Sequence, residues 1–135
     1  MNEEELRELD IQVHKALYPE WRIEKREWTH GIDYRAILPG DGPNTWVKDI
    51  PLPWYSTDIL DWEPVYKLKP EWWWDQDEHR DAAGGRYVAV TLRALVVPWW
   101  SFEVCVYGRE STGIAAYALG RARCVIAWAE GREER

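Results

Sequence analysis

Tryptophan is the residue that most constrains how this chain can fold. It occurs eleven times in 135 residues, and three copies stand together at Trp72-Trp73-Trp74. Each indole buries a large apolar area, but its N–H needs a hydrogen-bond partner when it leaves water. One small core cannot satisfy so many rings, so we expect some of them at half-exposed positions. Tryptophan is also a preferred residue of binding hot spots, and the composition therefore predicts a binding protein.

Length and charge narrow the classes of protein that fit. A chain of 135 residues is expected to form one domain, residues 1–135, with its own core. The net charge of -7 argues against broad, non-specific nucleic-acid binding, which needs a basic face. The acidic start, Met1 to Glu5, is unlike a secretory signal, and no apolar run approaches the length of a membrane span. We expect a protein of a reducing cytoplasm with free thiols at Cys105 and Cys124.

Three helices are predicted. Residues 2–17 have helical apolar spacing, with Asn2 as N-cap and Glu5 three residues on. A central helix is expected to begin near Ser56 as N-cap, but Pro64 requires either a kink or a later start capped by Asp61. The last helix is expected over residues 115–130, and Gly120 in its interior predicts close packing against a sheet.

Strands are predicted between these helices. Residues 21–38 alternate like two strands with a turn or bulge at Gly31, and Trp46 to Trp54 is extended. Residues 70–85 are expected to form a polar, tryptophan-rich excursion. Residues 86–107 give a hairpin in which the alternation runs from Val88 to Val96, with Arg93 placed opposite Glu103. The order predicts an α+β fold: an antiparallel sheet sandwiched by N-terminal, central and C-terminal helices.

No catalytic or metal-binding arrangement emerges from the spacing of polar residues. His14, His30 and His79 lie in three segments without metal-ligand spacing, and His14 is expected on a helix surface. The acidic run from Asp75 to Glu78 lacks the glycine and closing glutamate of a calcium loop. We therefore expect no enzyme, no metal and no cofactor.

One cluster remains as a candidate binding site. Indoles offer stacking platforms, and arginines offer forked donors that match phosphate oxygens. The tryptophans in irregular, proline-flanked stretches are the candidates for binding, whereas Trp28, Trp62, Trp100 and Trp128 are expected to pack in regular elements. A simpler interpretation is that the three consecutive indoles cover a sheet edge or a subunit contact. The predicted ligand-binding residues are Trp72, Trp73, Trp74, His79, Arg80, Arg86, Trp46 and Trp54.

The segment Tyr55-Ser56-Thr57-Asp58-Ile59, followed by Trp62-Glu63, resembles a known group of sequences. It is similar to small phage-encoded proteins that carry the phage ABA sandwich domain, in which such a segment opens the central helix. The final helix resembles theirs at Ala122-Arg123-Cys124-Val125-Ile126-Ala127. The chain departs from the family pattern at Pro64 and in the tryptophan-rich stretch of residues 70–85. The resemblance implies a phage protein in a bacterial host.

Two functional hypotheses follow from the resemblance and the tryptophans together. The first is a counter-defence protein that sequesters a nucleotide-derived immune messenger without catalysis, as a homo-oligomer with a closed pocket. The alternative is a protein-interaction module that inhibits a host protein directly, with tryptophans as hot spots and an acidic surface for steering. An enzyme that degrades the messenger ranks last, because the sequence offers no nucleophile and base.

Overall fold

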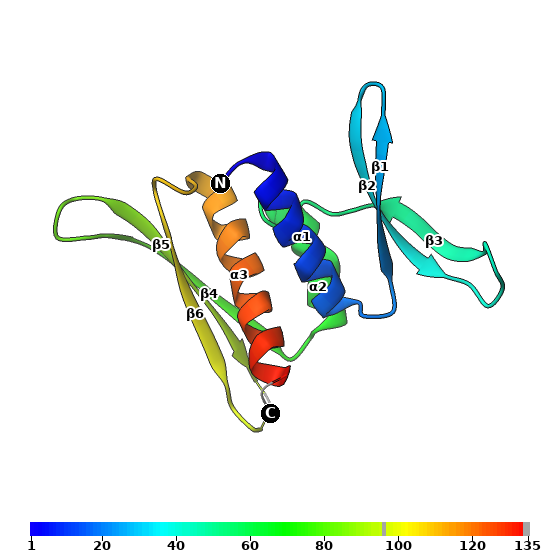
Figure 1. Ribbon diagram of the computed structural model, residues 1–135. Coiled ribbons are helices and arrows are strands. Elements are labelled where there is room, and N and C mark those ends of the chain that lie inside the picture. Colours follow the sequence, from blue (N-terminus) through cyan, green and yellow to red (C-terminus); the bar gives the residue numbers. More distant parts are fainter. Residues whose placement is uncertain (96, 134–135) are drawn as a thin grey trace.

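The computed structural model describes residues 1–95 and 97–133, and Figure 1 shows the arrangement of their elements. The helices are α1 (Glu3–Leu17), a 3-10 turn η1 (Ile59–Trp62), α2 (Glu63–Leu68) and α3 (Gly113–Glu133). The strands are β1 (Arg22–Trp28), β2 (Gly31–Pro39), β3 (Trp46–Pro51), β4 (Trp72–Arg80), β5 (Arg86–Ala94) and β6 (Ser101–Tyr107). The expected alternation at Val96 lies outside the described residues.

The α+β class is confirmed, but the strands form two sheets and not one. One antiparallel sheet has the order β1-β2-β3 and the other the order β4-β5-β6. Figure 1 shows the helices lying between the two sheets, with α3 against β4-β5-β6. The division into two sheets could not be predicted from the sequence, because the alternation of residues within a strand does not indicate which strands pair. No helix among the described residues is both long and apolar enough to cross a membrane.

Helix α1 lies between the two hydrophobic cores. Its N-terminus is capped as predicted, since the Asn2 side chain accepts a hydrogen bond from the Glu5 backbone N–H at 2.8 Å. Val13 and Leu17 are buried in the larger core, which α3 and the inner face of β4-β5-β6 complete. On another side, Ile11 packs on the smaller core under β2. One helix thereby holds the two sheets together.

Beneath α1 lies a buried polar cluster, made of Arg7, Asp10, His14, Tyr55 and Ser56. The Arg7–Asp10 ion pair is 2.8 Å long and buried on both sides, and the second carboxylate oxygen of Asp10 accepts the Ser56 backbone N–H at 2.7 Å. His14 Nδ1 and the Tyr55 hydroxyl are hydrogen-bonded at 2.7 Å. The expectation that His14 lies on the helix surface is wrong: the side chain is buried, with Nδ1 bonded to the Tyr55 hydroxyl and Nε2 without a hydrogen-bond partner among the described residues.

The central helix differs from both sequence alternatives. Ser56 does not cap it; Asp58 caps η1 by accepting the Leu60 backbone N–H at 3.0 Å. Helix α2 starts at Glu63, so Pro64 falls in its first turn, where the missing N–H has no partner to lose. Asp61 does not cap α2 either, because its carboxylate accepts the Trp54 backbone N–H at 2.7 Å.

The tryptophan-rich stretch is a regular strand, which corrects the expected irregular excursion. Strand β4 pairs along its whole length with β5, and β5 pairs with β6 as the predicted hairpin. The predicted pairing of Arg93 with Glu103 is wrong by two residues: Arg93 faces Ser101 and Thr91 faces Glu103. The sheet face predicted for both side chains is correct, because a shift of two residues keeps each side chain on the same face.

Gly120 allows α3 to approach the sheet closely, as predicted. A Cβ built at Gly120 would overlap Val90 Cγ2 and lie 2.9 Å from Val90 Cβ. Both residues are fully buried, so neither has room to move away.

We expect Gly120→Ala to destabilise the fold although alanine is the better helix former. Overpacking a tight core costs about 1–3 kcal/mol, and the gain in helix propensity offsets up to about 1 kcal/mol of it. Urea unfolding should show a net loss of about 1–2 kcal/mol. Gly131→Ala is the matched control in the same helix, because its Cβ would meet two Phe102 ring atoms at 3.1 and 3.4 Å, which is a much milder contact than at Gly120. Equal stabilities of the two variants would contradict the close-packing account.

His14 makes the stability depend on pH. Burial lowers the pKa of His14 from 6.5 to about 4, so the unfolded chain takes up this proton first as the pH falls. The contribution of neutral His14 to the free energy of unfolding is complete above pH 6.5 and is lost as the pH falls towards 4. From pH 7 to pH 5, wild type should lose about 2 kcal/mol more free energy of unfolding than His14→Gln.

Urea unfolding of both proteins at the two pH values is the measurement. Burial raises the pKa of Asp10, and this makes the free energy of unfolding change with pH in the opposite direction. Asp10 is present in both proteins, so its effect cancels when the two are compared. Parallel pH profiles for the two proteins would mean that His14 is not a buried, neutral side chain.

Candidate functional site

Strand β4 separates the three consecutive tryptophans onto two faces. Trp72 and Trp74 point inward: Trp72 is 7% exposed in the larger core, and Trp74 packs edge-on against the buried Trp62 with ring centroids 5.5 Å apart. Trp73 points to the outer face and is 54% exposed. Alternation along a strand produces this split, so the three indoles do not act as one platform.

The predicted arginines lie far from Trp73. Arg80 and Arg86 face each other at the opposite end of the β4-β5 hairpin, and Arg86 is near Glu78, with 3.8 Å between charged atoms. Seven residues of strand separate Trp73 from Arg80, which is about 23 Å at 3.3 Å per residue. His79 lies beside them on the outer face, stacked on Tyr87 at 5.2 Å. The structure therefore does not bring the predicted ligand-binding residues of this hairpin together.

The remaining predicted residues lie on the other side of the molecule. Trp46 starts β3 and is 58% exposed. Trp54 carries the Arg7 guanidinium on its ring, 3.7 Å from the ring centroid, so it helps to cover the buried polar cluster. Trp28, expected to pack, is 53% exposed at the end of β1. Trp28 and Trp46 pair with Gly31 and Pro39, at opposite ends of β2, so they do not form one patch.

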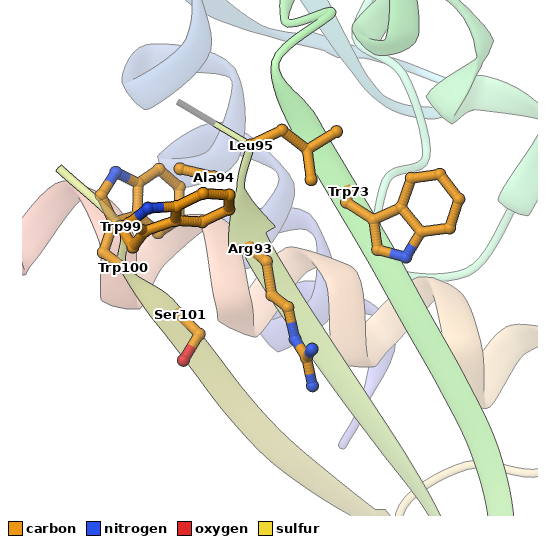
Figure 2. Close-up of a pocket in the computed structure, with 7 residues that line it drawn as sticks. All are labelled: Trp73, Arg93, Ala94, Leu95, Trp99, Trp100 and Ser101. Atoms are coloured by element: carbon orange, nitrogen blue, oxygen red, sulfur yellow. The ribbon is translucent and has the colours of Figure 1, made fainter. Parts of the chain in front are cut away.

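A groove is present where β4, β5 and β6 meet near the turn between β5 and β6. We call it the aromatic groove; it has a volume of about 640 Å³. Figure 2 shows Trp73 and Trp99 on opposite sides of Leu95 and Arg93. Trp99 is 70% exposed and Leu95 is 48% exposed, which is unusual for apolar side chains this large. Its lining residues are Trp73, Arg93, Ala94, Leu95, Trp99, Trp100 and Ser101.

Asp75 fixes the polar side of the aromatic groove. One carboxylate oxygen of Asp75 accepts the Trp73 indole N–H at 3.2 Å, and the other lies 3.2 Å from Arg93 Nε. The indole N–H is thereby satisfied while the ring face stays open. The ion pair with Asp75 neutralises Arg93, so this residue gives the aromatic groove no uncompensated positive charge.

Trp100 connects the aromatic groove to the core. Its ring is half-buried and lies 6.2 Å from Trp72 and 6.5 Å from Trp128, with a tilted contact to Phe102 at 5.6 Å. The floor of the groove is thus part of a packed aromatic cluster, while Trp73 and Trp99 stand above it. A groove with a rigid floor needs little reordering when it binds.

Sequence reasoning found Trp73 but missed the rest of the aromatic groove. Trp99 was not among the predicted ligand-binding residues and Trp100 was expected to pack, although Pro98-Trp99-Trp100 is itself a proline-flanked tryptophan pair. The register of β4 on β5, which sets Trp73 beside Arg93, was not available without the structure.

The groups with the most strongly altered pKa values lie away from the aromatic groove. Burial raises the pKa of the Cys124 thiol to about 12, which leaves it protonated and unreactive. Burial also raises the pKa of Tyr55, inside the buried polar cluster. Cys105 and Cys124 are both free thiols. Within residues 1–95 and 97–133, no group of three or more histidine, cysteine, aspartate or glutamate side chains is placed to hold a metal ion.

Comparisons with known proteins returned no match to a family model, to a curated protein or to a solved structure. The resemblance to phage ABA sandwich proteins therefore stays a prediction.

The split of the three tryptophans predicts opposite results for neighbouring substitutions. Trp72→Ala removes a buried ring and should cost about 3–5 kcal/mol in the free energy of unfolding. Trp73→Ala and Trp99→Ala remove exposed rings and should each change it by less than about 1 kcal/mol. Urea unfolding of the three variants is the measurement. Similar losses for Trp72→Ala and Trp73→Ala would contradict the strand assignment of residues 72–80.

Proposed function

We propose that this chain is a non-catalytic binding protein that docks on another protein through the aromatic groove. The observation that carries the proposal is the pair of exposed indoles, Trp73 and Trp99, held above a packed aromatic floor on an uncovered sheet face. Tryptophan is enriched among the few residues that supply most of the binding energy at protein interfaces. If the resemblance to phage proteins holds, the partner is a bacterial host protein and docking inhibits it.

Charge is the reason for preferring a protein partner to a nucleotide. Arg93 is the cation of the aromatic groove, and Asp75 already neutralises it. Arg80 and Arg86, the residues expected to bind phosphates, lie at the far end of the hairpin. A phosphorylated ligand would therefore have to displace Asp75 from Arg93, next to the further carboxylates of Asp77 and Glu103 on the same face.

Sequestration of a nucleotide-derived messenger stays the second candidate. The observation in its favour is that the opening between Trp73 and Trp99, about 640 Å³ in volume, has room for a nucleobase against an indole face. In this alternative the base stacks in the aromatic groove, and a second copy of the chain supplies the missing cations.

The docking proposal predicts loss of the partner from a tryptophan variant of the groove. Purified wild type should retain one bacterial protein from lysate in stoichiometric amount, and Trp73→Ala/Trp99→Ala should not. With the purified partner, the dissociation constant should rise about 30-fold or more, as for hot-spot residues. Trp28→Ala/Trp46→Ala is the matched control, because it removes two similarly exposed indoles from the other sheet.

Two outcomes would reject docking through the groove. One is a partner that binds the groove variant and wild type equally. The other is heat and tryptophan quenching on titration with cyclic ADP-ribose isomers or cyclic dinucleotides, lost in Trp73→Ala/Trp99→Ala, which would favour the messenger hypothesis.

A further inference from the structure

The outer face of the β4-β5-β6 sheet continues from the aromatic groove as an acidic trough. Two rows of three facing residues form it: Asp75–Thr91–Glu103 and Asp77–Ala89–Cys105. Small side chains on the central strand make the floor, and carboxylates stand on both outer strands. The cavity over these rows has a volume of about 430 Å³. Figure 1 shows α3 on the inner face of this sheet and no helix on the outer face.

The acidic trough carries uncompensated negative charge. Asp75 is paired with Arg93, but Asp77 and Glu103 have no ion-pair partner among the described residues. Glu103 accepts a hydrogen bond from the Thr91 hydroxyl at 3.2 Å, which holds its carboxylate at the side of the trough. Two open carboxylates on the same sheet face attract a cation by Coulomb interaction.

Aromatic rings close the far end of the acidic trough. His79 stacks on Tyr87 at 5.2 Å, and Tyr87 contacts Tyr107 at 5.7 Å. From Trp73 to His79 the strand advances six residues, which is about 20 Å. The strip of the outer sheet face from Trp73 to His79 therefore has aromatic rings at both ends and carboxylates between them. We call this strip, which joins the aromatic groove to the acidic trough, the lane.

We propose, on the basis of the docking function above, that the partner contributes a basic, extended segment that lies along this lane. Side chains on one face of an extended segment recur about every 6.6 Å, which is the spacing of the rows. A segment of about seven residues covers the lane. A large apolar side chain fills the aromatic groove, and lysine or arginine side chains follow over Asp77 and Glu103.

Other occupants fit this surface less well. Nucleic acid is repelled by the two open carboxylates and by the net charge of -7. A second copy of the chain would bring the same acidic face and the same net charge. A basic segment complements the surface and gains the steering that an acidic protein gives to a cationic partner.

The test is selection of binders from a random heptapeptide library displayed on phage, panned on the wild-type chain. Enriched peptides should carry an aromatic or large aliphatic residue and an excess of lysine and arginine over aspartate and glutamate. Synthetic copies should bind Asp77→Asn/Glu103→Gln at least about 10-fold more weakly than wild type. Glu8→Gln/Glu20→Gln removes two exposed carboxylates elsewhere and should bind them like wild type.

The variants distinguish failure of this inference from failure of the docking proposal. Peptides that require Trp73 and Trp99 but show no basic bias, or bind Asp77→Asn/Glu103→Gln normally, would leave docking intact and overturn the basic-segment proposal. Peptides that bind Trp73→Ala/Trp99→Ala as well as wild type would overturn both. Absence of any enriched peptide would also overturn the basic-segment proposal, because a lane of this kind should select its complement.

Discussion

The buried polar cluster between α1 and the segment before η1 is the contact on which the rest of the structure depends. Asp10 joins the Arg7 guanidinium to the Ser56 backbone, and His14 joins the Tyr55 hydroxyl, all out of water. Removing one partner of such a buried pair leaves an uncompensated charge or an unsatisfied donor, which is costly. The cluster therefore fixes how α1 lies on this segment, and α1 separates and connects the two cores.

That arrangement leaves one face of the β4-β5-β6 sheet uncovered. Because α3 occupies the inner face, the first half of β4 alternates between the core side and the outer face, whereas its second half, from Asp77 to Arg80, is exposed throughout. Trp72 and Trp74 join the core, and Trp73 stays outside to form one side of the aromatic groove. The same alternation places Asp75 and Asp77 beside it. A single strand thus supplies both the apolar contact and the negative charge of the proposed docking surface.

Sequence reasoning succeeded where the signal is local and failed where it depends on partners. The Asn2 cap, the β5-β6 hairpin and the tight site at Gly120 follow from residue type and spacing over a few positions. His14 was misplaced because its hydrogen-bond partner is 41 residues away. The tryptophan-rich stretch is a strand and not the expected excursion, because pairing with β5 outweighs the loop-like composition of its polar half. The aromatic groove needed the register of β4 on β5, which no single segment encodes.

The most direct test of the account is to follow the eleven indole N–H signals by NMR while a partner-derived or selected peptide is added. We expect the Trp73, Trp99 and Trp100 signals to shift or broaden, and those of the equally exposed Trp28 and Trp46 to stay unchanged. Shifts confined to Trp28 and Trp46, or indole signals that do not respond while the peptide binds, would contradict the aromatic groove as the binding surface.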